Sequence, residues 1–394
     1  MESKFISTYT HFVSDRSNSF ENYFSNRFGA DTTKTFPLRF GGNPLFYPFD
    51  PAIKEILGEI EEVITKIRNV SSSLPDIAMK ELARSCLVEE IMETNQLEGV
   101  FSTRKDVYRI LDDAKSSKSS KIRSIANKYA LLLSGAIPSV KTPKDIRNLY
   151  DELLSGALAK EDEPDGKLLR KEGVTITDGA RTIHRGLYPE SKIIEALEVF
   201  LSIENGSELT PIERAFIAHF IFEYAHPFYD GNGRCGRYLM TLFAMKDLPS
   251  VVAFRMSTAI GKRKEKYYKA FERTQDIRNR SDLSTFVYPN LEIFLEECDG
   301  LHDDIATKIE MAASLYRAIQ NSGIVLDQDP VIQTLADATS FATFGIRIQD
   351  IVASANVSIA TVKRRIKFLE EKGWLMKEKN GYQSYFRLSI DAIG

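Results

Sequence analysis

Residues 226–237 read His-Pro-Phe-Tyr-Asp-Gly-Asn-Gly-Arg-Cys-Gly-Arg, and this stretch predicts a helix end, a loop of small residues and a second helix. The residues before it, Pro211 to Ala225, are apolar on most faces and carry Glu213 in the first turn, which predicts a buried helix that delivers His226 at its C-terminal end. Residues 234–245 predict the next helix. Any chemistry in this stretch therefore lies between two helices.

The loop between these helices has the composition of an anion site. Gly231, Asn232 and Gly233 can adopt backbone angles closed to bulky residues, so successive N–H groups can converge on a phosphate at the start of the second helix. Arg234 and Arg237 are three residues apart and share a helix face, where they can contact different phosphates of a polyphosphate chain. The pattern indicates a nucleotide phosphate site.

Two side chains of the stretch are suited to catalysis. Asp230 is placed to hold Mg²⁺, which prefers one or two carboxylates together with phosphate oxygens. His226 can take a proton from an attacking hydroxyl, because histidine titrates near neutral pH. Taken singly, a histidine is usually a core residue and an Asp-Gly or Asn-Gly pair is usually a turn. The prediction depends on the whole string.

The string resembles the signature of the Fic family, in which His, Phe, Asp or Glu, Gly-Asn-Gly, Arg and a second Arg occur at this spacing. The resemblance implies AMPylation, the transfer of AMP from ATP to a Ser, Thr or Tyr hydroxyl of a target protein with release of pyrophosphate. It implies that His226 is the general base and that Asp230 binds Mg²⁺. It also implies nucleotide contacts from Asp230, Gly231, Asn232, Gly233, Arg234, Cys235, Gly236 and Arg237, with Phe228 as a core anchor.

An upstream segment, residues 94–99, reads Thr-Asn-Gln-Leu-Glu-Gly and resembles the inhibitory motif of Fic proteins. It follows a predicted helix from Ile77 to Leu97. The resemblance implies that Glu98 pairs bidentately with Arg237 and withholds that arginine from the γ-phosphate of ATP. The alternative is that Glu98 only ends a helix and Gly99 caps it in the left-handed conformation, and both can hold together.

Residues 173–185 predict a β-hairpin between helices, with two short strands around an Asp-Gly turn. The resemblance implies that this hairpin is the flap that docks the backbone of the target as an added strand and covers the nucleotide. The alternative is an ordinary surface hairpin. The edge of the flap that would face the site consists of Thr182, Ile183, His184 and Arg185.

Residues 266–271 resemble the family's Tyr-Tyr helix, whose aromatic faces line the adenosine pocket. The implied contacts are Tyr267 and Tyr268, although tyrosine pairs on amphipathic helices also serve in core and surface packing. Gln275 stands where some relatives carry a nucleotide-contacting Asn, and this departure retains the amide.

The end of the chain has a separate character. Residues 345–352 and 356–372 predict helix, turn and helix, with Ser358 as the cap of the second helix and an apolar stripe formed by Ile359, Val362, Ile366 and Leu369. Asn380-Gly381 between two alternating segments predicts a hairpin. The segment resembles a winged helix-turn-helix. Its nine Lys and Arg against four Asp and Glu over residues 345–390 favour duplex DNA as a partner, and dimerisation or target docking is the alternative.

Composition limits the remaining classes. The net charge of −3 argues against bulk affinity for polyanions, and 43% hydrophobic residues are enough for sizeable cores. Neither a run of eighteen apolar residues nor a signal-peptide core is found, and Cys86, Cys235 and Cys298 are odd in number and widely spaced. We therefore expect a cytoplasmic protein that does not bind membranes. We expect Cys235 to be a small filler residue rather than a reactive thiol.

The sequence thus predicts a mainly α protein, a Fic-fold helical bundle with a β-hairpin flap and a C-terminal winged helix. The expected domains are an N-terminal tail or wrapping segment (1–48), a helical region with the inhibitory helix (49–135), the Fic catalytic core (136–300), a connecting helix (301–324) and the winged helix (325–394). The expected cofactors are ATP and Mg²⁺, and the expected partners are a target protein with an acceptor hydroxyl, a second copy of the chain and, as a candidate, DNA.

Other functions remain open at this stage. A Fic core can transfer UMP or remove AMP, with Glu98 aligning a hydrolytic water, and phosphorylation is a further variant. A DNA-binding regulator in which the Fic core only senses nucleotide is an alternative of another class. A toxin of a toxin–antitoxin pair fits less naturally, because the inhibitory motif lies in the same chain.

Overall fold

The computed structural model describes residues 5–15, 19–40, 42–112, 120–178, 181–206 and 208–393. Its α-helices are α1 (Thr8–Ser14), α2 (Phe20–Phe28), α3 (Pro51–Ser71), α4 (Asp76–Gln96), α5 (Arg104–Asp112), α6 (Ser120–Leu133), α7 (Pro143–Leu153), α8 (Glu190–Glu204), α9 (Pro211–Ala225), α10 (Asn232–Ala244), α11 (Ser250–Ala253), α12 (Met256–Lys262), α13 (Lys264–Gln275), α14 (Ser284–Asn321), α15 (Pro330–Thr339), α16 (Ile348–Ala355), α17 (Ile359–Glu371) and α18 (Ile390–Ile393). The 3-10 helices are η1 (Lys160–Asp162), η2 (Ile277–Asn279) and η3 (Leu326–Gln328). The strands are β1 (Lys34–Phe40), β2 (Asn43–Tyr47), β3 (Thr175–Asp178), β4 (Arg181–Arg185), β5 (Ile346–Arg347), β6 (Leu375–Asn380) and β7 (Gln383–Leu388). The predicted mainly helical fold is confirmed.

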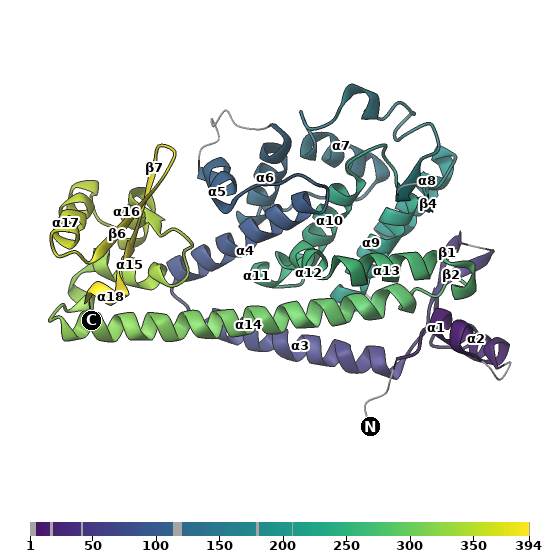
Figure 1. The fold of residues 1–394 in the computed structure, drawn as a ribbon, viewed down its shortest axis with the longest axis horizontal. Helices are drawn as coiled ribbons and strands as arrows, with labels where there is room; N and C mark the ends of the chain where they lie inside the picture. The colour runs from purple at the N-terminus through teal and green to yellow at the C-terminus, as the bar shows by residue number, and fades with distance from the viewer. Residues whose placement is uncertain are drawn as a thin grey trace.

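A long pair of helices runs along one side of the molecule, where α3 packs against α14 (Figure 1). α14 has 38 residues, which corresponds to about 57 Å at the usual helical rise. Its first half contributes Phe286 and Phe294 to the main hydrophobic core, and its second half contributes Leu315 and Ile319 to a second, smaller core. The helix therefore connects the two cores.

The helices that carry the 226–237 loop lie inside the main core. α9 begins with a capping box, in which the hydroxyl of Thr210 accepts from the N–H of Glu213 and the carboxylate of Glu213 accepts from the N–H of Thr210. Pro211 occupies the first helical position, where its missing N–H has no consequence. α8, α10 and α14 pack around α9, which explains why its apolar residues extend over nearly all faces. The buried helix predicted from Pro211 to Ala225 is confirmed.

The first 48 residues, expected as a tail or wrapping segment, contain α1, α2 and the β1–β2 hairpin, all beside the start of α14 (Figure 1). The Thr8 hydroxyl donates to the buried Asp282 carboxylate at 2.5 Å, and Arg27 pairs with both Asp282 and Asp50. Phe46 of β2 exchanges main-chain hydrogen bonds with the segment before α14. These contacts attach the segment to the helical body. Gly41, part of a predicted turn, lies outside the described residues.

α15 to α18 and strands β5 to β7, residues 330–393, form a separate unit that we call the C-terminal module (Figure 1). Its sheet has the order β5-β7-β6 with antiparallel pairing, and Gly381 turns the β6–β7 hairpin at φ +64°. The hydroxyl of Ser358 accepts from the N–H of Thr361, which confirms the predicted cap of α17. Ile359 does not join the predicted apolar stripe. It is 54% exposed, because it stands in the first turn of α17 beyond the reach of the core.

Two smaller predictions concern loops and membranes. The hairpin predicted within residues 173–185 forms as the antiparallel pair β3–β4, while Gly179 and Ala180 at its turn lie outside the described residues. The Lys- and Ser-rich sequence of residues 115–121 predicts a polar loop, and residues 115–119 also lie outside the described part of the chain, while Ser120 begins α6. Among the described helices, none combines the length and apolar composition of a membrane span.

Candidate functional site

The catalytic histidine predicted from sequence is the residue at which α9 ends. His226 adopts the left-handed conformation, φ 50° and ψ 63°, and its N–H donates to the carbonyl of Phe222 at 3.0 Å. Residues other than glycine are uncommon in this conformation, so surrounding contacts must maintain the conformation of His226. The turn directs the chain out of α9 and into the loop that precedes α10.

Arg170, which the sequence analysis missed, holds this turn in place. Its side chain is fully buried, and Nε donates to the carbonyl of His226 at 2.7 Å. The other guanidinium nitrogens donate to the carbonyls of Glu172, Leu187 and Ala225. One arginine thus joins the residues before β3, after β4 and at the end of α9. No local pattern could have indicated this role, because the carbonyls it satisfies are distributed over 55 residues of chain.

The loop itself is closed by two interactions of its own residues. The side-chain amide of Asn232 accepts from the N–H of Phe228 at 2.9 Å and donates to its carbonyl at 2.8 Å. Phe228 is buried and stacks on Tyr150 with ring centroids 3.6 Å apart, which agrees with its predicted role as a core anchor. Asn232 therefore shapes the loop with its side chain, and only its backbone remains as a candidate phosphate contact.

Gly231 is favoured by its left-handed conformation, and Gly231 and Gly233 both lie close to neighbouring side chains. Gly231 has φ +76°, and a Cβ there would lie 2.1 Å from Leu154. A Cβ on Gly233 would lie 2.2 Å from Oε1 of Glu98 and 2.7 Å from Nη1 of Arg237. The first turn of α10 can therefore approach an anion closely, and its N–H groups are those that a helix leaves without intrahelical acceptors. This arrangement fits a phosphate.

Arg237 and Glu98 meet in the structure. Arg237 is buried, and its Nη2 donates to Oε1 of Glu98 at 2.8 Å. The predicted bidentate pairing is not what the structure shows, because Nε donates to the hydroxyl of Thr94 at 3.0 Å and Nη2 also to the Thr94 carbonyl at 2.9 Å. The guanidinium thus divides its donors between Glu98 and Thr94. Both residues belong to the segment 94–99.

Glu98 and Arg237 each stabilise the charged form of the other. Burial is the largest single influence on Glu98 and favours its neutral form, but the charge and hydrogen bond of Arg237, together with Arg234, lower the pKa of Glu98 below its ordinary value. Burial likewise disfavours the cation of Arg237 and is the largest single influence, but Glu98 and Glu223 together outweigh it and raise the pKa of Arg237. Both groups are therefore charged at neutral pH, and an anionic ligand of Arg237 must replace Glu98.

His226 is neutral at physiological pH. Burial, with a further contribution from the neighbouring ring of His184, lowers the pKa of His226 to about 4. The two rings lie 6.3 Å apart between centroids. An unprotonated imidazole is the form that accepts a proton, so burial keeps His226 in the state that a general base requires.

Asp230 is the accessible carboxylate of the loop. Its side chain is 47% exposed, and Oδ2 accepts from Nη2 of Arg234 at 3.2 Å. Among the described residues no group of three His, Cys, Asp or Glu side chains is arranged to hold a metal ion. Mg²⁺ does not need one, because it is usually held by one or two carboxylates and completed by phosphate oxygens and water. Asp230 fits that mode of binding.

Cys235 and Gly236 lie inside α10 rather than at the surface of the loop. Burial raises the pKa of the Cys235 thiol well above its ordinary value, so the thiol stays protonated, in agreement with a packing role. A Cβ on Gly236 would lie 2.3 Å from Oε1 of Glu223. Both positions are small because α9 and α10 pack closely here.

The flap strand β4 is anchored to α13 through one amide. Gln275 donates from Nε2 to the carbonyl of Ile183 at 2.9 Å, and its Oε1 lies 2.7 Å from Nδ1 of His184. His184 is buried, and its Nε2 contacts the carbonyl of Tyr224 at 2.8 Å. Gln275 and His184 therefore position the flap instead of presenting free polar groups to a nucleotide. Thr182 and Arg185 are the exposed residues of this strand.

The two tyrosines of α13 have different surroundings. Tyr267 is buried, contacts Nε2 of His219 through its hydroxyl at 3.0 Å and packs on Phe286, so it is a core residue and not part of an open pocket. Tyr268 is 50% exposed, and Arg237 and Glu98 both influence its pKa, which burial raises. Consecutive residues of a helix point about 100° apart, so only one of the pair can face the site.

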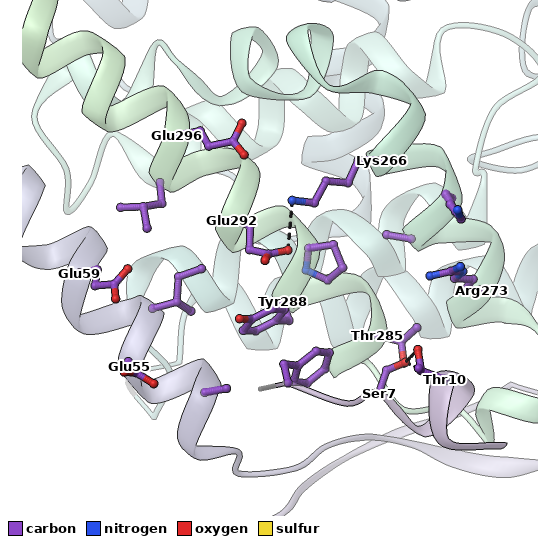
Figure 2. A pocket seen from close by; sticks show the side chains of 17 residues that line it. Ser7, Thr10, Glu55, Glu59, Lys266, Arg273, Thr285, Tyr288, Glu292 and Glu296 are labelled. Carbon is purple, nitrogen blue, oxygen red and sulfur yellow. Dashed lines mark hydrogen bonds and ion pairs between the residues drawn. The ribbon is translucent and has the colours of Figure 1, made fainter. Parts of the chain in front are cut away.

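A cavity lies elsewhere in the described part of the chain (Figure 2). It has a volume of about 990 Å³ and lies between α1, α3, α13 and α14. Glu55 and Glu59 line it from α3 and Glu292 from α14, where Lys266 of α13 pairs with Glu292 at 3.1 Å. None of its lining residues belongs to the 226–237 loop. The candidate site is therefore defined by its residues rather than by cavity size.

Comparison with known proteins agrees with the site. Residues 141–244 match the model of the Fic/DOC family, and the chain therefore contains a Fic/DOC family domain. The chain is 25% identical over 230 residues to a probable protein adenylyltransferase of Aquifex aeolicus (strain VF5), covering 58% of this chain and 60% of that protein. It is 32% identical over 96 residues to the protein adenylyltransferase Fic of Drosophila melanogaster, covering 24% of this chain and 18% of that protein. The chain thus spans less than two thirds of the length of either relative.

Solved structures share the fold. A Fic family protein from Desulfovibrio desulfuricans G20 superposes with a TM-score of 0.51 at 20% identity, covering 87% of this chain and 97% of that one. Fic-1 from C. elegans superposes with a TM-score of 0.51 at 18% identity, covering 76% and 82%. The predicted Fic fold is confirmed by these two structures.

Proposed function

We propose that this chain is a protein adenylyltransferase that transfers AMP from ATP to a Ser, Thr or Tyr hydroxyl of a target protein, and that Glu98 inhibits it. The observation that carries the proposal is the placement of a neutral, partly buried His226 shortly before a helix N-terminus that presents Gly231, Gly233 and two arginines. The names of the relatives from Aquifex and Drosophila support the same activity.

The residues would act as follows. The phosphates of ATP would lie on the first turn of α10, with Arg234 and Arg237 on the β- and γ-phosphates. Asp230 would hold Mg²⁺, which supplies charge neutralisation on the phosphates. Tyr268, the exposed tyrosine of α13, would face the adenosine, and the edge of β4 would dock the target segment as an added strand.

In the reaction, the target hydroxyl attacks the α-phosphorus while His226 accepts its proton. A bond forms between the hydroxyl oxygen and the α-phosphorus, the bond from that phosphorus to the bridging oxygen breaks, and pyrophosphate leaves. Positioning and charge neutralisation provide most of the acceleration in such transfers. Arg170 contributes indirectly, because it holds the turn that orients His226.

Inhibition would follow from the Glu98–Arg237 contact. The γ-phosphate of ATP needs Arg237, whose donors are divided between Glu98 and Thr94 in this structure. Release of Glu98 requires only a modest shift in free energy, since allosteric couplings are typically about 1–3 kcal/mol. The same carboxylate would align a hydrolytic water in an enzyme that removes AMP, so the products must be identified as well as the label.

Incorporation of labelled α-phosphate from ATP into protein tests the proposal. We expect weak labelling by the wild type, at least tenfold stronger labelling by Glu98→Gly, and none by Glu98→Gly/His226→Ala. UTP and γ-labelled ATP serve as controls for UMP transfer and phosphorylation. Silence of Glu98→Gly in the presence of bound ATP would refute the proposed activity and favour nucleotide sensing.

A second function is supported by one face of the C-terminal module, which we propose to be a winged helix that binds duplex DNA. Ile359, Lys363, Arg364 and Lys367 of α17 are all exposed, at the positions from which a recognition helix contacts bases and phosphates. Fluorescence anisotropy with a random 24-base-pair duplex at increasing salt tests it. We expect Lys363→Gln/Arg364→Gln to weaken binding and to reduce its salt dependence. Salt-independent or absent binding contradicts it.

We also propose that the chain forms the homodimer predicted from sequence. Light scattering of the purified protein over a range of concentrations will determine the oligomeric state.

A further inference from the structure

Glu98 lies on the turn between two helices that both contact the C-terminal module. α4 ends at Gln96, α5 begins at Arg104, and Glu98 stands between them. The module contributes α15, α16 and the β6–β7 hairpin to contacts with the first half of α4 and with α5 (Figure 1), whereas Arg237 contacts Thr94 near the end of α4. The position of the inhibitory carboxylate is therefore linked through both flanking helices to the module.

The first half of α4 is attached to the module by apolar and polar contacts. Ile77 belongs to the second hydrophobic core, which otherwise consists of residues from α14 onward. Lys80 pairs with Asp350 of α16 at 3.0 Å, and the Ser85 hydroxyl lies 3.3 Å from that of Thr343. α4 is an uninterrupted helix of 21 residues, about 31 Å long, so a displacement at this half is transmitted to Thr94 and Glu98.

The centre of the interface is the buried carboxylate of Asp112, at the end of α5. It pairs with Arg84 of α4 at 2.5 Å and with Arg347 of the module at 2.6 Å, and it also accepts from the hydroxyl of Tyr385. The Asp112 side chain is 2% exposed. Because a buried carboxylate is stable only while its partners remain, separation of the module from α5 would remove Arg347 and Tyr385 from Asp112 and leave Arg84 as its ion-pair partner. Asp112 thus joins α4, α5 and the module at one point.

The β6–β7 hairpin of the module lies against the start of α5. Asn380 donates from Nδ2 to the carbonyl of Lys105 at 2.7 Å and accepts from Nη2 of Arg109 at 3.1 Å. Glu378 pairs with Lys105 at 2.8 Å. The Lys105 and Glu378 side chains are 52% and 33% exposed, so this ion pair is at the edge of the interface, whereas Asn380 is buried. Lys105 and Glu378 can be altered without disturbing a core.

We propose that the C-terminal module restrains the α4–α5 turn and thereby sets how often Glu98 leaves Arg237. A partner that draws the β6–β7 hairpin away from α5 would then activate the enzyme. The module contacts α5 and the first half of α4 rather than the end of α4 beside Arg237, so it needs no contact with ATP or the target. The inference rests on the proposed function for its activity readout, and hydrogen exchange provides a readout that does not.

A charge exchange at the exposed edge is the first test. Lys105→Glu places two carboxylates opposite each other, and we expect about threefold stronger labelling than the wild type. Lys105→Glu/Glu378→Lys restores an opposite-charge pair, and we expect labelling to return to the wild-type level. Rescue by the double variant distinguishes loss of restraint from a general effect of altering α5.

Removal of the central charge is the second test. Asp112→Asn should increase labelling about tenfold, without exceeding Glu98→Gly. Arg365→Gln is the matched control, because Arg365 forms an ion pair with Asp329, the N-cap of α15, and its described contacts do not reach α4 or α5. We expect Arg365→Gln to label like the wild type. Circular dichroism melting confirms that each variant is folded at the assay temperature.

Amide hydrogen exchange of peptides covering residues 94–103 is measured on the same proteins. We expect faster exchange in Lys105→Glu and Asp112→Asn, and wild-type exchange in the charge-exchanged double variant and in Arg365→Gln. If exchange and labelling remain at wild-type levels in both single variants while Glu98→Gly labels strongly, the restraint is refuted and the proposed function stands. If Glu98→Gly is silent, the proposed function fails, and the exchange data alone decide the restraint.

Discussion

The loop from His226 to Arg237 and the contact of Glu98 with Arg237 share one residue but are built differently. The loop is a continuous stretch of twelve residues, and its shape comes from neighbours such as Asn232 and Phe228, four residues apart. The contact joins Arg237 to Glu98 over 139 residues of sequence and depends on how α4 packs against α10. The comparison teaches that residues close together in sequence shape the loop, whereas the contact of Arg237 with Glu98 depends on how distant helices pack.

Substitution of His226 in the loop should have the largest effect on the rate of transfer. His226→Ala in a Glu98→Gly background removes the proton acceptor while leaving the phosphate contacts, and we expect transfer to fall by about 10²–10⁴-fold. Steady-state labelling with saturating ATP measures it, and ATP binding by calorimetry should change little. A residual rate within tenfold of the parent would show that His226 is not the base.

Substitution of Arg170 tests whether the loop keeps its conformation without contacts from distant segments. Arg170→Met keeps the length of the side chain but leaves four buried carbonyls with fewer donors, at a cost of about 1–3 kcal/mol for each unsatisfied group. We expect a lower melting temperature and at least tenfold weaker transfer in the Glu98→Gly background. Unchanged transfer in a folded protein would mean that the turn at His226 needs no support from β3 and β4.

Substitution of Thr94 tests the contact between Arg237 and residues 94–99. Thr94→Val retains the shape of the side chain but removes the acceptor for Nε of Arg237, which weakens the restraint by one hydrogen bond, worth about 1 kcal/mol. We expect labelling to increase about threefold to tenfold, and Thr94→Ser to behave as the wild type. Lower labelling by Thr94→Val would instead indicate that Thr94 positions Arg237 for the nucleotide.

The smallest effect is expected from pH. The pKa of His226 is lowered to about 4 by burial, so the ring is neutral in the folded protein throughout pH 5.5–8. Between about pH 4 and 6.5 the unfolded chain binds a proton at His226 that the folded protein does not bind. The free energy of unfolding therefore rises as pH rises through that window. An NMR titration of the ring, assigned with His226→Ala, should show no midpoint above pH 5.5. A midpoint near 6.5 would contradict the burial.

The sequence predicted most of the helical fold because the hydrophobic pattern and the caps are local. The buried helix Pro211–Ala225, the β3–β4 hairpin and the cap of α17 at Ser358 all occur where expected. Its errors concern residues whose orientation depends on distant neighbours. Arg237 divides its donors between Thr94 and Glu98 instead of pairing bidentately with Glu98, and Ile359 is exposed rather than part of the stripe of α17.

By itself, the sequence determined the local bonds of the loop from His226 to Arg237, such as the pairing of Asn232 with Phe228, since residues so close along the chain can interact whatever surrounds them. The tertiary structure alone decided that Arg170 supports His226, that Gln275 anchors the flap, and that Asp112 joins α4, α5 and the C-terminal module. Each of these groups is buried with partners from distant segments. A buried charge or amide has no periodic signature, because its position becomes favourable only when folding brings those partners within hydrogen-bonding distance.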